Sequence, residues 1–246
     1  MKERLTVGIV WLVTLSLPFL LGFTVIGVTI QQAELYLRYQ YLNNRNFPPD
    51  LYRVMPETIA AMGLEPLVGE QRVEMAMVAV DFLNRSEPAE EIIYLLGDQV
   101  SPTTGRVWYN EAELQHMVDV KNVTDGVKRI NWVLLGLILV SWGYLWWQGE
   151  KLALYRSVRN GGMMTMGILV GLGLFMIVAW DLFFVQFHEL LFPPGSWTFA
   201  YSDGLIRLFP EKFWFDVGMI LSGLPLLAGV VVTAVGWWLV RRETAK

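Results

Sequence analysis

LTVGIVWLVTLSLPFLLGFTVIGVTI, residues 5–30, is a continuous apolar run that contains no charged side chain. A helix of about 20 such residues is long enough to cross the hydrocarbon core of a bilayer. The run exceeds the apolar core of a cleaved signal peptide, which has about 7–15 residues, and no small-x-small cleavage site is obvious at its end. We therefore interpret residues 5–30 as a retained transmembrane helix.

Three further apolar runs follow, at residues 130–148, 163–187 and 213–240, and the first of these three is the shortest. The chain of 246 residues is 54% hydrophobic and only 17% charged, which is unusual for a soluble domain. We predict an all-α membrane protein with four transmembrane helices, organised as a single integral membrane domain over residues 1–246.

The net charge and the cysteine count exclude several classes of function. The net charge is −4, so the chain offers no concentrated basic surface that could neutralise nucleic-acid phosphates. The sequence contains no cysteine. Disulfides, thiolate metal sites and cysteine nucleophiles are therefore excluded.

Basic residues gather in three short segments at the ends of the predicted spans, residues 1–4, 149–162 and 241–246. They are Lys2, Arg4, Lys151, Arg156, Arg159, Arg241, Arg242 and Lys246. With four spans these segments share one side, which the positive-inside rule assigns to the cytoplasm. We predict that both termini are cytoplasmic and that residues 31–129 and 188–212 lie on the outer face.

The two outer segments differ in character. In the first, residues 70–83 have the spacing of an amphipathic helix, and Asn110 is a predicted N-cap with Glu113 three residues on. The helix that starts there is predicted to continue into the second span. Residues 188–212 are rich in aromatic side chains and interrupted by the sequence PPG, which predicts a re-entrant or interfacial loop between the third and fourth helices.

The chain has two histidines, His116 and His188, and the predicted topology puts both on the outer side near the membrane. Histidine is the side chain best suited to move protons near neutral pH. Asp119 follows His116 by three residues, so on a helix it shares the same face and could orient the imidazole. Asp181 lies two helical turns before His188 and is a further ionisable candidate.

Two other interpretations of the histidines stay open at this point. His116, Asp119 and His188 could supply three ligands to a metal in a membrane hydrolase, although no HExxH spacing is present. Alternatively, both histidines could be packing residues at the membrane interface of a non-enzymatic scaffold.

The second outer segment also allows plain structural interpretations. Asp203 and Arg207 could form an ordinary i, i+4 ion pair on a helix. Trp197 and Tyr201 could be interfacial anchors, because amphipathic rings are favoured at headgroup depth. Ser196 does not fit the G-x-S-x-G pattern of a nucleophilic serine.

Two stretches resemble a known family of bacterial membrane proteins. They are ELQHMVDVK at residues 113–121 and FHELLFPPGSWTFAYSDGLIRLFPEKF at residues 187–213. Together with the four-span layout and the large loop after the first span, they resemble the lipoprotein intramolecular transacylase (Lit) family. The resemblance covers essentially the whole chain, although residues 48–105 match only in general character.

The resemblance implies transfer of the sn-2 acyl chain of an S-diacylglyceryl-cysteine lipoprotein to its free N-terminal cysteine amine, on the extracytoplasmic face of a bacterial cell membrane. It implies no cofactor, and its partners are diacylglyceryl-modified lipoproteins and membrane lipid. We predict His188 as the general base and His116, oriented by Asp119, as acid or oxyanion stabiliser, with the reverse division also open. The predicted substrate contacts are Arg207, Asp203, Trp197, Tyr201 and Lys121.

Overall fold

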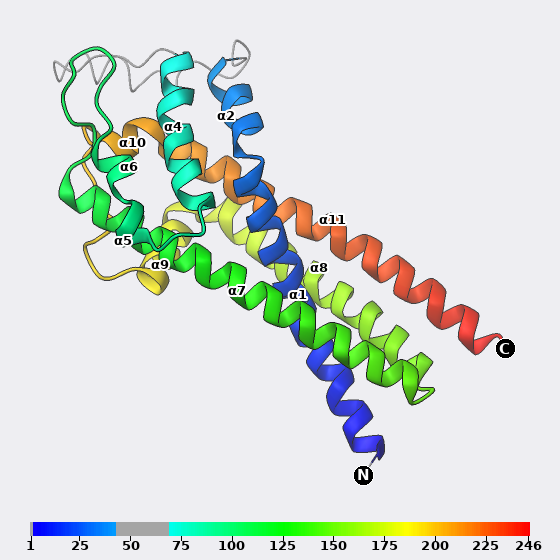
Figure 1. Ribbon diagram of the computed structural model, residues 1–246. Helices are drawn as coiled ribbons and strands as arrows, with labels where there is room; N and C mark the ends of the chain where they lie inside the picture. Colours follow the sequence, from blue (N-terminus) through cyan, green and yellow to red (C-terminus); the bar gives the residue numbers. More distant parts are fainter. Residues whose placement is uncertain (1, 43–68) are drawn as a thin grey trace. The chain divides into compact units, whose positions relative to one another are not determined.

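The computed structural model describes residues 2–42 and 69–246, and within these residues the regular elements are all helices (Figure 1). They are α1 (Lys2–Gln31), α2 (Ala33–Leu42), α4 (Gly69–Asn84), α5 (Ala89–Ile92), α6 (Tyr94–Gly97), α7 (Glu111–Trp147), α8 (Lys151–Val178), α9 (Trp180–Leu191), α10 (Gly204–Leu208) and α11 (Glu211–Thr244). Residues 43–68 of the predicted outer segment lie outside the described residues.

The chain divides into two compact units. The first unit comprises Met1–Gly27, Gly126–Trp180 and Gly218–Lys246. The second unit comprises Val28–Asp125 and Asp181–Val217, and it therefore contains both histidines.

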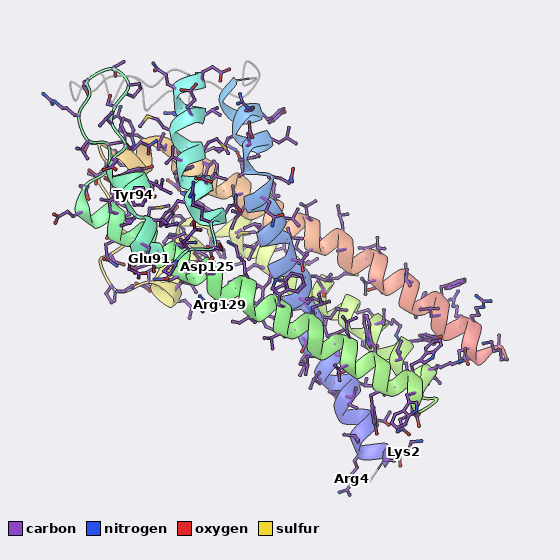
Figure 2. All side chains as sticks on the ribbon, in the orientation of Figure 1. Lys2, Arg4, Glu91, Tyr94, Asp125 and Arg129 are labelled. Carbon is purple, nitrogen blue, oxygen red and sulfur yellow. The ribbon has the colours of Figure 1, made fainter. Side chains whose placement is uncertain are left out.

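Four helices, α1, α7, α8 and α11, are long and apolar enough to cross a membrane. The prediction of an all-α membrane protein with four transmembrane helices is therefore confirmed. α7 has 37 residues, or about 55 Å at 1.5 Å per residue, so its first half extends well before the apolar run. Its predicted continuation from the first outer segment into the second span is also confirmed. Figure 2 labels Lys2 and Arg4, which lie at the N-terminal end of α1.

The third predicted span, residues 163–187, has different boundaries in the structure. α8 begins at Lys151, within the predicted cytoplasmic loop, and the backbone leaves the helical region at Ala179, with φ −142° and ψ 56°. The rest of the predicted span belongs to α9. No Gly or Pro stands at this break, and Asp181 is the one charged residue beside it, so the mainly apolar pattern of residues 163–187 did not predict a new helix there.

Small residues bring the helices of the first unit close together. A Cβ atom on Gly161 would lie 2.7 Å from a side-chain atom of Leu17 in α1, and one on Gly162 would lie 2.8 Å from the carbonyl oxygen of Gly229 in α11. Membrane helices commonly associate through such contacts, because lipid leaves little hydrophobic drive between them. The buried hydrophobic cluster of this unit consists of Val13, Leu17 and Ile138.

The second unit has its own hydrophobic core. α4 confirms the helix predicted over residues 70–83, and it buries Val73, Ala76 and Val80 at helical spacing. Among the other large buried side chains of this core are Leu37, Phe82, Leu96, Trp108, Leu208 and Phe213. The core thus joins α2, α4, α6 and α10, and it supports the part of α7 that carries the first histidine.

Candidate functional site

The two histidines meet in the second unit. His116 lies in the second turn of α7, and His188 lies near the C-terminal end of α9. Their ring centroids are 6.4 Å apart and their planes are inclined by 24°. His116 is only 6% exposed, and His188 is half-buried. The sequence indicated a shared side of the membrane, and the structure adds that the two rings lie almost parallel to each other.

Aromatic rings surround both imidazoles. The aromatic cluster consists of His116, Phe184, His188, Phe192, Trp197 and Phe199. The centroids of the four other rings lie between 4.1 Å (Phe184 to His188) and 5.6 Å (Phe192 to His188) from those of the imidazoles they contact. Three segments contribute to the cluster: α7, α9 and the loop that follows α9. This apolar surrounding is suited to excluding water from a reaction between the histidines.

His188 is held by its own helix. Its Nδ1–H donates a hydrogen bond of 2.7 Å to the backbone carbonyl oxygen of Phe184, one turn earlier. A carbonyl oxygen only accepts, so this bond places the proton of neutral His188 on Nδ1 and leaves the lone pair on Nε2. Burial lowers the pKa of His188 from its ordinary value of 6.5, and the bond to Phe184 opposes this effect. The ring is therefore neutral at pH 7 and can accept a proton at Nε2.

Two nitrogen atoms of the aromatic cluster are buried without a hydrogen-bond partner among the described residues. They are Nδ1 of His116 and Nε1 of Trp197. A buried polar group without a partner costs about 1–3 kcal/mol, so such atoms are normally matched by water or by a ligand. Both atoms belong to side chains within ring contact of His188, which makes them candidates for substrate contact.

Asp119 makes no hydrogen bond to His116, although its charge acts on the imidazole. Its Oδ1 accepts a hydrogen bond of 3.2 Å from Nε2 of Gln115, and no hydrogen bond joins the two predicted partners within the described part of α7. Nor do residues 2–42 and 69–246 contain a group of three or more His, Cys, Asp or Glu side chains arranged to hold a metal ion. His116, Asp119 and His188 are therefore not gathered as the three ligands of the metal-dependent alternative.

Glu113 has a larger role than the helix cap that its sequence position predicted. Its Oε2 accepts the backbone N–H of Asn110 over 2.8 Å, and Oδ1 of Asn110 accepts the N–H of Glu113 over 3.0 Å, which confirms the predicted capping box. In addition, its Oε1 accepts the N–H of Leu205, in α10, over 2.6 Å. The side chain is 1% exposed. One carboxyl group thus joins the start of α7 to the segment that follows the aromatic loop.

The predicted substrate contacts of the second outer segment occupy different surroundings. Oδ2 of Asp203 accepts the backbone N–H three residues earlier over 2.8 Å and so closes the turn before α10. The guanidinium carbon of Arg207 lies 4.4 Å from the ring centroid of Trp108, and Arg207 is buried. Tyr201 is 65% exposed. Of these predicted contacts, Trp197 is the one that belongs to the aromatic cluster.

Lys121 has a structural role in place of the predicted substrate contact. Its side chain is fully buried, and its Nζ donates to the carbonyl oxygen of Arg85 over 2.7 Å and to Oδ2 of Asp125 over 3.0 Å. Figure 2 labels Asp125, which follows on the same helix, α7. Arg85 directly follows α4, so the ammonium group caps the C-terminal end of that helix and attaches it to α7.

The residues of the aromatic cluster lie within a match to a known protein family. The sequence matches the family described as lipoprotein intramolecular transacylase Lit over residues 73–214, which include every member of the aromatic cluster as well as Glu113. The matched residues are more than half of the chain. The chain belongs to the Lit family. The resemblance seen in the sequence is thereby confirmed, and at the level of the Lit family the protein is a membrane enzyme of the acyltransferase type that acts on lipoproteins.

Solved structures of Lit share the fold. The in meso structure of the membrane-integral Lit from Bacillus cereus has a TM-score of 0.74 at 16% identity, over 99% of this chain and 100% of that chain. A variant of that Lit with a histidine replaced by alanine has a TM-score of 0.69 at 16% identity, over 100% of this chain and 98% of that chain. An uncharacterized protein of Aquifex aeolicus is 26% identical over 233 residues, 92% of this chain and 93% of its own length. The protein is therefore a multi-pass membrane protein with the Lit fold.

Proposed function

We propose that this Lit family member moves the sn-2 acyl chain of an S-diacylglyceryl-cysteine lipoprotein to the free α-amine of that cysteine, which yields the lyso-form lipoprotein. The observation that carries the proposal is the pair of stacked histidines inside the aromatic cluster, with the Nε2 lone pair of His188 available. The substrate brings its own nucleophile in this reaction. A chain without cysteine and without a serine elbow is therefore sufficient.

The chemistry needs one proton removed and one returned. An α-amine has a pKa of about 8, so a neutral imidazole can take its proton as the nitrogen attacks the ester carbonyl carbon. His188 is the base in this scheme, since its Nδ1–H is already bonded to Phe184. A C–N bond forms, the bond from the acyl carbon to the sn-2 oxygen breaks, and that oxygen gains a proton. When His116 is the acid, it gives its proton to the sn-2 oxygen and then recovers the proton that His188 took from the amine. When His116 stabilises the oxyanion, His188 itself passes the amine proton to the sn-2 oxygen, so in either case the protein ends the cycle with its starting protons.

Water exclusion favours amine attack over hydrolysis. The four non-histidine rings of the aromatic cluster lie within 6 Å of one or both imidazoles, centroid to centroid, and provide an apolar wall. The enclosed ester then meets the tethered amine at a high effective concentration, because both belong to one molecule. The charge bias of the sequence supports a site on the extracytoplasmic face of a bacterial cell membrane, with both termini in the cytoplasm.

Mass spectrometry of lipoprotein N-termini tests the proposal. In a host that makes only the diacylglyceryl form, expression of the protein should give N-acyl, S-monoacylglyceryl cysteine at unchanged total mass. His188→Ala and His116→Ala should each reduce the conversion rate by about 10²–10⁴-fold, the usual contribution of a positioned acid or base.

The matched control is Glu189→Ala, an exposed neighbour of His188 on the same helix. This variant should convert the substrate at the wild-type rate and insert in the membrane to the same level. A free cysteine amine and two ester-linked chains in the presence of inserted wild-type protein would contradict the proposed function.

A further inference from the structure

The indole of Trp197 lies against the proposed base. Its ring centroid is 5.0 Å from that of His188, and the planes are inclined by 34°. A tight turn brings it there: Gly195 adopts φ +81°, in the left-handed region that favours glycine, and the backbone N–H of Ser196 donates to the carbonyl oxygen of Pro193 over 3.1 Å. The chain reverses directly after α9, so Trp197 returns to the helix that carries His188.

The indole N–H of Trp197 has no acceptor within the part of the chain that the structure describes. Indole nitrogen is a donor only, so a carbonyl, carboxylate or water oxygen must match it. A buried donor without a partner is strongly attracted to developing negative charge, because a low local dielectric strengthens the interaction. An unmatched N–H beside a general base is the arrangement that an oxyanion requires.

A second buried tryptophan, Trp108, has surroundings that differ from those of Trp197. Nε1 of Trp108 is also buried without a partner among the described residues, but that ring lies under the guanidinium group of Arg207 and against the backbone of Gly204. A Cβ atom on Gly204 would lie 2.6 Å from Nε1 of Trp108, so the indole is packed tightly into the core. Trp108 has no histidine beside it in the ring contacts of the second unit, whereas Trp197 does.

Building on the transacylase function above, we propose that Trp197 is a catalytic hydrogen-bond donor, whose Nε1–H binds the carbonyl oxygen of the migrating acyl ester. When the amine attacks the carbonyl carbon, this oxygen becomes an oxyanion, and the hydrogen bond strengthens. When the bond to the sn-2 oxygen breaks, the same oxygen becomes the carbonyl oxygen of the new amide. The donor therefore gives no proton away and acts on the charge that appears only in the transition state.

The test compares the wild-type protein with two variants that lack the N–H, using a purified diacylglyceryl lipopeptide. Trp197→Phe keeps an aromatic ring, and replacement of Trp197 by benzothienylalanine keeps the shape of the indole with sulfur in place of N–H. Both changes should lower kcat by about 10²–10³-fold with little change in KM, which is the typical cost of one oxyanion donor. Trp132→Phe, at an exposed position of α7, is the control and should keep the wild-type kcat.

The outcomes separate the two proposals. If the wild-type protein converts the lipopeptide and the benzothienylalanine variant keeps kcat within about twofold, the donor role of Trp197 is overturned, because one lost oxyanion donor costs far more. If the wild-type protein itself fails to convert the lipopeptide, the transacylase function fails instead. The benzothienylalanine variant has the packing volume of the native side chain, so its loss of kcat supports the donor role even where Trp197→Phe unfolds.

Discussion

At the scale of single residues, the hydrogen bond between His188 and Phe184 supports the proposal that His188 is the base. The sequence left the division between base and acid open. With Nδ1–H donated to a backbone carbonyl oxygen, His188 presents only Nε2 to a substrate, and that atom is an acceptor while the ring is neutral. Nδ1 of His116 makes no such hydrogen bond, since it is buried without a partner among the described residues.

The pH dependence of the reaction follows from the lowered pKa of His188. Because burial favours the neutral ring, the base stays active below its ordinary pKa of 6.5 and is lost only in more acidic solution. Protonation of the substrate amine reduces kcat/KM by about tenfold per pH unit below its pKa of about 8. We expect a second, steeper fall that begins below pH 6.5, when His188 takes up a proton.

Initial rates on a purified lipopeptide, measured from neutral to acidic pH, check this profile. A variant with a residual rate, such as His188→Ala, should lose the second fall and keep the first. A second fall that begins at or above pH 6.5 would contradict the burial argument for His188.

At the scale of secondary-structure elements, Glu113 connects the start of α7 to α10. Two backbone N–H groups, from Asn110 and Leu205, donate to the two oxygens of one buried carboxyl group. His116 follows one turn later on α7, and the loop that precedes α10 carries Trp197. The link therefore connects α7 to the end of the loop that carries Trp197 and Phe199, and both segments contribute rings to the aromatic cluster.

Replacement of Glu113 by Gln tests this link. The amide keeps one acceptor oxygen and turns an NH₂ group towards a backbone N–H, so one buried hydrogen bond becomes a donor–donor contact. We expect a loss of about 1.5–3 kcal/mol in folding free energy, the range for a hydrogen bond to a charged group. Thermal denaturation in detergent should show a lower midpoint.

Glu111→Gln makes the same chemical change in the same helical turn at an exposed position, and it should leave the midpoint unchanged. Equal midpoints for Glu113→Gln and Glu111→Gln would show that the buried carboxyl group adds nothing to the stability of the fold.

At the scale of the whole molecule, the topology depends on the positive-inside rule applied to four spans. The four helices are present, and the basic residues of the termini and of the first turns of α8 share one side in any four-span arrangement. On the basis of that rule we propose that the residues of the second unit lie on the outer face.

The absence of cysteine makes this topology directly measurable. Thr104→Cys places a thiol at an exposed position of the predicted outer segment, and Ala245→Cys places one at the exposed C-terminus. A membrane-impermeant maleimide should label the first variant in intact cells, and the second only after the membrane is permeabilised. The cysteine-free parent chain is the control and should stay unlabelled in both states. The opposite labelling pattern would reverse the assignment of the two faces.

Local patterns were sufficient for the spans, for the cap formed by Asn110 and Glu113, and for the helix now seen as α4. Hydropathy and helical periodicity arise from neighbouring residues, so they can be recognised before the chain folds. The family resemblance likewise rested on short motifs around His116 and His188 and was confirmed by the family match.

Tertiary packing determined the structural features that the local sequence patterns did not predict. The helix break at Ala179 has no Gly or Pro beside it, Lys121 caps a helix far from it in sequence, and Glu113 bonds to Leu205 through a contact that spans 92 positions. The distance of 6.4 Å between the centroids of the two histidine rings likewise depends on tertiary packing. A local pattern cannot encode such contacts, because each depends on how segments distant in the chain bury their apolar surface against one another.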